Sequence, residues 1–280
     1  MRVSGKARMM RMFTNGGCLD VAVDHGVCNE PGFLVGLEDM AAVVDTLVRA
    51  RPDAIQMAYG QADLLQRRPE KDKPALVMRI DMGNPYNLQR HRVMWSMLQN
   101  HDEPIIGALE MDAACVVVNL FMLPDEPELL RQCVENISRV RASCRTYGMP
   151  LMIEPLVMLP NEVRGGYQVD GDVEKIVTLV RLASEMGADI IKADPTDNPA
   201  DFHRVVEAAR VPVLVRGGGK EGLKSLLMKS ATLMAQGAMG MVYGRNIYQH
   251  DKPKAVVDAL MAMIHRGASG EEAWDIYNDG

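Results

Sequence analysis

The stretch ADIIKADPTDN, residues 188–198, indicates a buried strand that ends in polar residues. Ile190 and Ile191 are typical of a strand interior, and Pro195 ends the element. Between them stands Lys192, whose ammonium loses free energy when it leaves water. The lysine therefore has three candidate roles: it extends outward to solvent, it pairs with a carboxylate, or it works as a neutral amine.

Seven further short apolar runs also indicate buried strands, and they alternate with amphipathic helical patterns. Many are rich in Val and Ile without strict alternation, as expected for strands covered on both faces. Eight such units in about 250 residues fit a (β/α)8 barrel, so we predict an α/β protein with a TIM barrel. The predicted strands are LDVAVDH (19–25), AIQMA (54–58), ALVMRID (75–81), CVVVNL (115–120), LMIEPL (151–156), DIIKAD (189–194), VLVRGG (213–218) and GMVYG (240–244). The predicted helices are 38–50, 127–147, 172–187, 199–209, 221–236 and 252–266.

The main rival fold is a doubly wound open sheet, which usually begins with a glycine-rich turn. The first turn here, AVDHGVCNEPG (22–32), contains no GxGxxG. No linker or shift in composition divides the chain, so we predict a single barrel domain over residues 1–280, with a short N-terminal extension and a C-terminal helical tail. The segment 82–114 has the least regular pattern and is predicted to hold an extra loop.

Composition narrows the class of protein. Hydrophobic residues make up 48% and charged residues 24% of the chain, which is typical of a soluble globular protein. The net charge is −6 and aromatics total 5%, so we expect no nucleic-acid partner. No apolar run approaches the roughly 18 residues of a membrane span, so we expect no membrane partner either. Five cysteines without CxxC spacing and an N-terminus without a signal peptide predict a cytoplasmic protein with reduced thiols.

Polar and ionisable side chains stand at the C-terminal ends of the predicted strands, where barrel enzymes place their active sites. Buried polar groups need partners, so a closed network is more plausible than a series of isolated accidents. In chain order these residues are Asp24 and His25, Gln56, Arg79 and Asp81, Asn119, Glu154, Lys192, Arg216 to Gly219, and Tyr243 to Arg245.

A lysine in this setting has a specific chemistry. Burial and cationic neighbours such as Arg79 and Arg216 favour a neutral amine, which attacks a carbonyl and forms a Schiff base that serves as an electron sink. Such chemistry needs proton carriers, and Asp24 and Glu154 are the candidates. The alternative is that Lys192 forms an ion pair with one of these carboxylates and serves structure alone.

The neighbouring groups could also have purely structural roles. Asp24 could cap the turn that follows its strand, and His25 is better explained as a hydrogen-bonded turn histidine than as a second acid or base. Glu154 is a stronger candidate, because a glutamate followed by Pro155 inside IEPL is poor material for a surface strand.

Glycines after the seventh and eighth strands suggest an anion-binding site. Barrels often bind phosphate at these two loops, where glycine allows close approach and an arginine adds a charged contact. The predicted phosphate-binding and substrate-binding residues are Gly218, Gly219, Gly244, Arg245, Arg216, Arg79 and His25. The six histidines are dispersed and His25 alone stands at a strand end, so we predict no metal site and no cofactor.

Four segments together resemble the class I aldolases of the DeoC/LacD and archaeal-type fructose-bisphosphate aldolase superfamily. The resemblance extends from about residue 18 to 265 and implies a (β/α)8 barrel, a Schiff-base lysine at Lys192, an active-site aspartate at Asp24, and phosphate binding at Gly218-Gly219 and Gly244-Arg245. The four segments are AVDHG (22–26), GADIIKADPTD (187–197), VRGGGK (215–220) and GAMGMVYGRNIYQ (237–249).

The sequence departs from the archaeal fructose-bisphosphate aldolases on the fifth strand. That group places a tyrosine for proton transfer there, whereas this chain has Glu154 and no tyrosine on the strand. It is similar instead to the tagatose-bisphosphate and sulfofructose-phosphate aldolases, which carry a glutamate, so the resemblance assigns proton transfer to Glu154. Tyr167 could deliver a phenol from the loop outside the strand. Arg216 replaces a small residue and could reach a second anionic group or pair with Glu154.

The predicted function is a metal-independent lyase that cleaves or forms a C–C bond in a phosphorylated ketose through an imine on Lys192. Glu154 moves protons, and Asp24 positions Lys192 or assists breakdown of the carbinolamine. The expected partners are a small phosphorylated sugar and further copies of the chain in a homo-oligomer. The alternatives are an acyl- or ketoacid-transferring relative of the aminodideoxyheptulosonate synthase or autoinducer-processing type, and a non-catalytic barrel that senses sugar phosphates.

Overall fold

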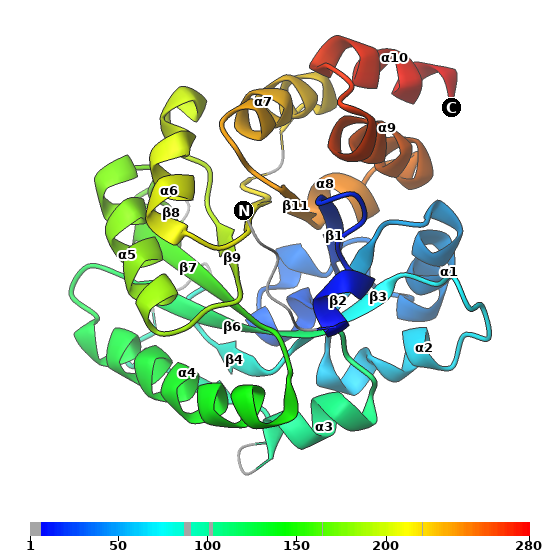
Figure 1. Cartoon of the computed structure of the whole chain (residues 1–280). Helices are drawn as coiled ribbons and strands as arrows, with labels where there is room; N and C mark the ends of the chain where they lie inside the picture. The colour runs from blue at the N-terminus through cyan, green and yellow to red at the C-terminus, as the bar shows by residue number, and fades with distance from the viewer. Residues whose placement is uncertain (1–6, 87–90, 101–102, 164, 220) are drawn as a thin grey trace.

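Eight parallel strands close into a barrel in the computed structural model, which describes residues 7–86, 91–100, 103–163, 165–219 and 221–280. The strands follow the order β6-β3-β2-β1-β11-β10-β9-β7, and pairing of β6 with β7 closes the ring (Figure 1). The predicted TIM barrel is confirmed. The barrel strands are β1 Cys18–Ala22, β2 Ala54–Ala58, β3 Ala75–Arg79, β6 Cys115–Met122, β7 Leu151–Pro160, β9 Ile190–Ala193, β10 Val213–Arg216 and β11 Gly240–Tyr243.

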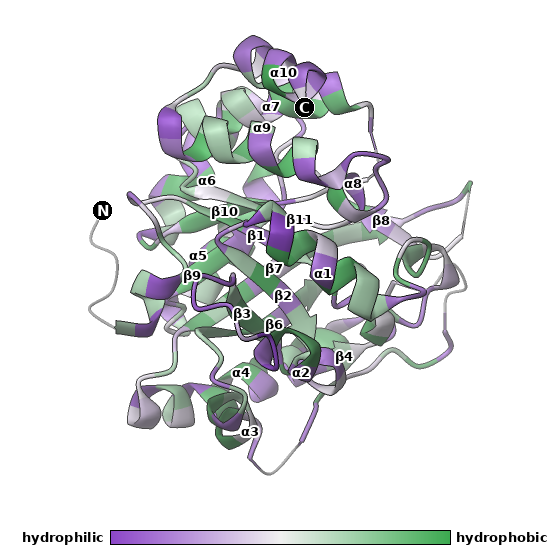
Figure 2. Ribbon diagram, turned by 90° about the vertical axis from the view of Figure 1, so that its right-hand side faces the viewer, coloured by the Kyte–Doolittle hydropathy of each residue, from purple (hydrophilic) through white to green (hydrophobic). Residues whose placement is uncertain are grey.

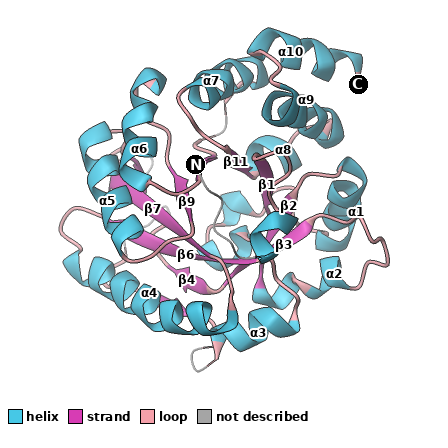
Figure 3. Cartoon of the chain, viewed as in Figure 1, coloured by secondary structure: helices cyan, strands magenta, loops and turns pink. Residues whose placement is uncertain are grey.

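Helices surround the barrel as an outer layer (Figure 3). Local sequence sets their ends: α4 has Pro127 in its first turn and ends at Gly148, whose φ of 65° is the left-handed conformation that glycine adopts without strain. The α-helices are α1 Met40–Ala50, α2 Asp63–Gln66, α3 Pro104–Glu110, α4 Pro127–Tyr147, α5 Val173–Glu185, α6 Phe202–Ala209, α7 Leu223–Ala235, α8 Arg245–Tyr248, α9 Pro253–Arg266 and α10 Gly270–Asp279. The 3-10 helices are η1 Ala7–Arg11, η2 His25–Cys28, η3 Pro31–Phe33, η4 Tyr59–Gln61 and η5 Pro199–Asp201.

The irregular segment 82–114 is more ordered than a loop. Strand β4, Asp81–Gly83, pairs antiparallel with β5, Ser96–Leu98, and α3 follows. Residues 87–90 and 101–102 lie outside the described part of the chain. A second small addition, β8 Tyr167–Val169, pairs antiparallel with the end of β7. Both additions lie beyond the C-terminal ends of barrel strands, so they extend the walls of that end of the barrel.

The core has two compartments. The larger one fills the space between the barrel strands and the helices, and the smaller one fills the barrel lumen. In the lumen, side chains such as Val77, Val117 and Leu214 pack against Met12 and Phe13 from the N-terminal segment. In Figure 2 the central strands are largely green, while purple gathers on the outer helices and loops.

The C-terminal helix α10 packs against α7 and α9 (Figure 1). Ser269 caps it in a reciprocal arrangement with Glu272, so the sequence itself specifies where this helix begins. In the described residues, no helix combines the length and the apolar composition needed to cross a membrane.

Candidate active site

A cavity opens at the C-terminal ends of the barrel strands. Its lining includes most of the residues predicted from strand ends: Asp24, His25, Arg79, Glu154, Lys192, Arg216, Gly218, Gly244 and Arg245. Gly219 is different, because it is exposed to solvent one residue beyond the lining. These residues come from six strands or strand ends, and Asn119 on β6 adds a seventh to the cavity lining.

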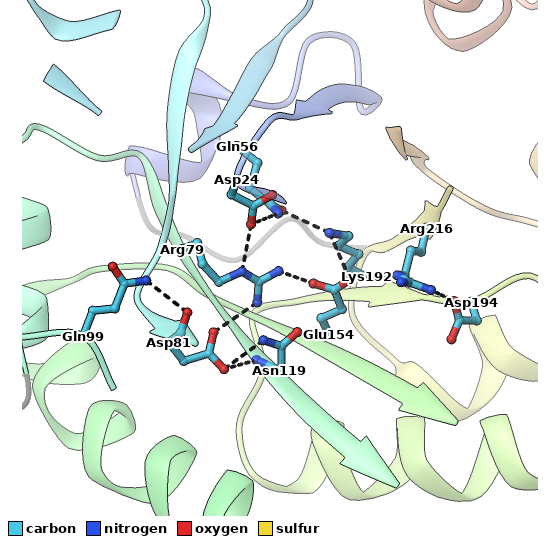
Figure 4. A network of polar contacts seen from close by, with 10 residues as sticks. All are labelled: Asp24, Gln56, Arg79, Asp81, Gln99, Asn119, Glu154, Lys192, Asp194 and Arg216. Carbon is cyan, nitrogen blue, oxygen red and sulfur yellow. Dashed lines mark hydrogen bonds and ion pairs between the residues drawn. The ribbon is translucent and has the colours of Figure 1, made fainter. Parts of the chain in front are cut away.

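Lys192 lies on β9 and is buried, with 4% of its surface exposed. Its Nζ lies 3.0 Å from Oε1 of Glu154 and donates a hydrogen bond of 3.3 Å to Oε1 of Gln56 (Figure 4). The side chain points into the network rather than outward to solvent. Of the three roles considered for this lysine, extension to solvent is therefore excluded.

Glu154, on β7, is the anion at the centre of the network. Its Oε1 also lies 3.0 Å from Nε of Arg216, and its Oε2 accepts a hydrogen bond from Nη2 of Arg79. Burial alone would raise the pKa of Glu154, but Lys192, Arg79 and Arg216 outweigh it and hold that pKa far below its usual range. Glu154 is thus ionised at rest and balances the charges of the three cations around it.

Arg79 organises the acidic side of the cavity. Its Nε donates to Oδ2 of Asp24 over 2.9 Å, and its Nη1 donates to Oδ1 of Asp81 over 3.2 Å. Asp81 also accepts from both the backbone N–H and the side-chain amide of Asn119, so its orientation is fixed. Each nitrogen of the guanidinium contacts a different carboxylate, the third being that of Glu154, so Arg79 links three acids of the network.

Asp24 follows β1 and connects to the lysine through an amide. Gln56 donates to Oδ2 of Asp24 over 2.7 Å and accepts from Lys192 with its own oxygen. Burial raises the pKa of Asp24, but the Arg79 guanidinium and the Lys192 ammonium bring it below the usual value. The carboxylate is therefore ionised and orients both Gln56 and, through it, Lys192.

Arg216, at the end of β10, makes two ion pairs. Its Nε contacts Glu154, and its Nη1 donates to Oδ1 of Asp194 over 2.6 Å. Between the two alternatives considered for Arg216, the structure contains the pair with Glu154. With its contacts taken by protein carboxylates, Arg216 anchors the network at its β9–β10 side.

Arg245 differs from the other cavity arginines because no ion pair holds it within the described residues. Its guanidinium carbon lies 4.4 Å from the centre of the Phe33 ring, and its Nη2 is 3.5 Å from the carbonyl oxygen of Gly218. Burial and the charge of Arg216 lower the pKa of Arg245. An anion beside Arg245 would relieve this unfavourable setting.

Gly244 and Gly218, the two glycines near Arg245, differ in what surrounds them. A Cβ at Gly244 would stand 2.5 Å from the carbonyl oxygen of Ala22 and 2.6 Å from the His25 ring, so close packing of β11 against the first loop requires glycine there. A Cβ at Gly218 would meet nothing within 4 Å. The space beside Gly218 is therefore open, as a bound group would need.

Aromatic rings from several loops pack together beside the cavity arginines. Ring centroids of His25 lie 5.7 Å from Phe33 and 5.6 Å from Tyr248, and those of Tyr86 lie 5.9 Å from Phe33 and 5.5 Å from Phe121. Burial lowers the pKa of His25 to about 4, so its imidazole is neutral near pH 7. The hairpin of β4 and β5 brings Tyr86 to the cavity, a position that the local sequence did not indicate.

Tyr167, considered as a source of a phenol, lies on β8 opposite Pro160 of β7, and the cavity lining formed by the described residues does not include it.

Sequence reasoning missed two buried acids around the cavity. Asp194, the last residue of a predicted strand, was given no role in the site, although it accepts a hydrogen bond from Arg216. Asp20, in the middle of an apolar strand, is fully buried. An acid with apolar neighbours on both sides was the signal for Asp20.

The family of the chain follows from its similarity to known proteins. It is 31% identical to an uncharacterized aldolase of Saccharolobus solfataricus over 276 residues, which cover 98% of this chain and 99% of that protein. It is 27% identical to 2-amino-3,7-dideoxy-D-threo-hept-6-ulosonate synthase of Halobacterium salinarum over 278 residues, which cover 98% of this chain and 96% of that enzyme.

A solved structure shares the fold. It is an archaeal fructose-1,6-bisphosphate aldolase with its catalytic Lys covalently bound to the carbinolamine intermediate of the substrate, and it superimposes with a TM-score of 0.73 at 22% identity, covering 92% of this chain and 98% of that one. Residues 18–250 of this chain match the sequence pattern of the DeoC/LacD family aldolases. The resemblance predicted from the strand-end residues is thus confirmed. The chain belongs to the DeoC/LacD family of aldolases.

Proposed function

We propose that this chain is a class I aldolase that cleaves or forms a C–C bond in a phosphorylated ketose through an imine on Lys192. One observation carries the proposal: the Lys192 amine lies against the ionised Glu154 in the same cavity as Arg245, a cation without an acidic partner among the described residues. A nucleophile, a proton acceptor and a site for an anion are the three parts that this reaction needs.

The proposed cleavage begins when the amine of Lys192 bonds to the ketose carbonyl carbon. The proton that the Lys192 ammonium first gives up to Glu154 passes to the carbinolamine hydroxyl, which leaves as water, and a protonated imine remains. Glu154 then takes the proton of the hydroxyl beside the breaking bond, the electron pair of that bond moves into the imine, and the aldehyde leaves. The same proton returns from Glu154 to the enamine carbon, and water releases the second product from Lys192.

Asp24 has a positioning role in this proposal. Its carboxylate holds the Gln56 amide, whose oxygen accepts a hydrogen bond from the Lys192 amine. Because Gln56 is thereby locked in orientation, the nitrogen of Lys192 is directed toward the open part of the cavity. The Asp24 carboxylate would also stabilise the positive charge that develops on this nitrogen as the carbinolamine loses water.

The substrate phosphate would bind between the loops after β10 and β11. Gly218 leaves open space there, Arg245 supplies positive charge, and the two approach each other at the cavity mouth. Phosphate binding at these two loops is common in barrels of this kind. The family membership and the carbinolamine reported for the archaeal aldolase with the same fold add support.

Borohydride trapping tests the proposal directly. The protein is incubated with a panel of ketose phosphates, reduced with borohydride, digested, and analysed by mass spectrometry. We expect a mass increase equal to the reduced substrate on the peptide that contains Lys192. Ligand binding without a trapped adduct would instead support a barrel that senses sugar phosphates.

A second candidate is transfer of an acyl or ketoacid unit. It is favoured by the Halobacterium salinarum synthase, which matches this chain over nearly its whole length. The two candidates share the lysine imine and differ in the second substrate. Donor ketose phosphates offered with either simple aldehydes or acyl acceptors separate them, because product appears with one class of acceptor and not with the other.

A further inference from the structure

Asp20, the third residue of β1, faces the barrel lumen beneath the proposed catalytic groups. Cys18 and Ala22 on the same strand belong to the cluster that fills the lumen, and side chains alternate between the two faces of a strand. Asp20 lies between them in sequence and shares their face. Its register partners, Ala54 on β2 and Val242 on β11, are also lumen residues.

The carboxyl group of Asp20 stands alone among the described residues. Both of its oxygens are buried and have no hydrogen-bond partner in that part of the chain. Asp24 and Glu154, in contrast, each accept a hydrogen bond from Arg79. An ionised carboxylate without such a donor is costly in a low dielectric, and burial accordingly raises the pKa of Asp20 to about 8, against the attraction of Lys192.

Lys192 shares the barrel lumen with Asp20, because Ile190, two residues before it on β9, and its register partner Leu214 on β10 both belong to the lumen cluster. Its positive charge favours the ionised form of Asp20. The other titratable and charged groups that face Asp20 from its own and surrounding strands are Cys18, Asp24, Arg79, Cys115 and Glu154. Burial raises the pKa of both thiols, so they stay neutral. The ionisation of Asp20 therefore bears chiefly on whether Lys192 keeps its proton.

We propose that Asp20 is a positioning residue that controls the protonation of Lys192, the nucleophile of the proposed function. As a neutral acid it adds no negative charge below the lysine, so the amine can release its proton and attack a carbonyl. Once ionised, Asp20 attracts the ammonium and retains it. Above the pH at which Asp20 ionises, the fraction of reactive amine therefore rises less steeply with pH.

Cyanate labelling of Lys192 tests this inference without any substrate. A neutral amine bonds to the carbon of isocyanic acid and its proton passes to the cyanate nitrogen, which gives carbamoyl-lysine. The labelling rate of Lys192, measured by peptide mass spectrometry, is divided by that of the exposed Lys71 in the same sample. This normalised rate in Asp20→Asn is then divided by the same normalised rate in wild type. We expect the quotient to rise by about tenfold or more from pH 7 to pH 9, because the variant lacks the nearby negative charge that wild type gains over this range.

Controls make the outcome specific. Cys18→Ala alters the same face of β1 without removing an acid, so its ratio to wild type should stay constant over the same pH range. Asp20→Ser serves as a second uncharged replacement if Asp20→Asn does not fold. The proposal would be overturned if the normalised labelling rate of Lys192 changed with pH in the same way in wild type and in both Asp20 variants from pH 7 to pH 9. Because cyanate needs no ketose, a failed borohydride trap rejects the proposed function while the labelling ratio still decides the role of Asp20.

Discussion

Lys192 pairs with a carboxylate and is still suited to nucleophilic chemistry. The two roles were alternatives when the sequence alone was considered, yet the 3.0 Å contact with Glu154 serves both. In the resting protein the pair satisfies a buried ammonium. During the proposed reaction the same carboxylate is already beside the nitrogen, where protons must move.

Lys192→Arg tests the nucleophile. Arginine keeps the positive charge beside Glu154, so we expect the variant to fold, but a guanidinium does not form the imine and turnover should be abolished. Steady-state rates and borohydride trapping measure the two effects, and EDTA should not reduce the wild-type rate. Substantial turnover by Lys192→Arg would contradict the proposed mechanism.

Glu154→Gln tests proton transfer. Loss of a general acid–base group costs about 10²–10⁴-fold in rate, and we expect a decrease of that size in kcat while the imine is still trapped. The buried Lys192 and Arg79 and the half-buried Arg216 also lose their carboxylate partner, so the free energy of unfolding should fall by roughly 3–5 kcal/mol in a urea titration.

Tyr167→Phe is the matched control for Glu154→Gln. It removes the phenol outside the strand and should leave the rate near that of wild type. Normal turnover in Glu154→Gln together with slow turnover in Tyr167→Phe would assign the proton carrier to the tyrosine instead.

Asp20→Asn should change how stability depends on pH. The pKa of Asp20 is about 8 in the folded protein against an ordinary 3.8, so between those values the folded state holds a proton that the unfolded chain has released. Stability then falls as pH rises, by about 1.4 kcal/mol per pH unit. The difference between the free energy of unfolding of Asp20→Asn and that of wild type should therefore increase by roughly 4 kcal/mol in favour of the variant from pH 5 to pH 8.

Urea titrations at the two pH values measure this difference. The exposed Asp275→Asn removes a carboxylate from α10 and should leave the wild-type pH dependence in place. A stability difference between Asp20→Asn and wild type that does not change with pH would show that Asp20 is already ionised at pH 5 or that its charge is compensated.

At the scale of elements, loops after the strands complete the lining of the cavity. The first loop carries Phe33, which stacks on Arg245 from the loop after β11. The hairpin of β4 and β5 adds Tyr86, and the loop after β10 adds the open position at Gly218. The strands thus hold the chemical groups in place, while separate loops supply the proposed anion site and the aromatic rings.

Arg245→Ala tests the anion site in these loops. A charged hydrogen bond is worth about 1.5–3 kcal/mol, so KM for a phosphorylated substrate should rise by roughly ten- to a hundredfold. An unphosphorylated analogue should be cleaved with nearly unchanged KM, because it has no anion to lose the contact. The exposed Arg266→Ala, on α9, is the control for loss of an arginine as such.

Equal losses on both substrates, with a lower Tm, would mean that Arg245 braces the last turn of the barrel rather than binding phosphate. Since the guanidinium stacks on Phe33, the stability measurement accompanies the kinetic one.

At the scale of the whole molecule, the two ends of the barrel have different tasks. The C-terminal end carries the cavity, and the N-terminal end is closed by Met9, Met12 and Phe13, which pack into the lumen. In Figure 1 the dark blue N-terminal segment lies across the strands near the centre of the barrel. Arg8 and Arg11 tie this segment to Asp112, just before β6.

Phe13→Ala should reduce stability without altering catalysis. Removal of a buried aromatic ring costs about 3–5 kcal/mol, and a denaturant titration should show a loss of that size. Values of kcat and KM at a temperature where the variant is folded should match those of wild type, since the cavity is at the other end. A large change in KM would mean that the N-terminal segment affects the active site.

Much of the fold could be predicted from local sequence. Helix α4 and strand β2 have the predicted bounds, because a long amphipathic period and a short buried apolar run are strong local signals. Strand β1 was predicted to extend to residue 25 and ends instead at Ala22. Asp24 and His25 belong to a turn and a 3-10 helix, whose geometry depends on the loop that packs over them.

By itself, the sequence determined the barrel, the family, and the placing of acids, arginines and a lysine at strand ends. These follow from periodicity and from residue type, which act over a few neighbouring positions. Only the tertiary structure decided that Glu154 meets Lys192, Arg79 and Arg216 at once, that Arg245 has no acidic partner among the described residues, and that Asp20 is buried alone. Such pairings join side chains far apart along the chain, and they depend on strand register and barrel closure, which no local pattern encodes.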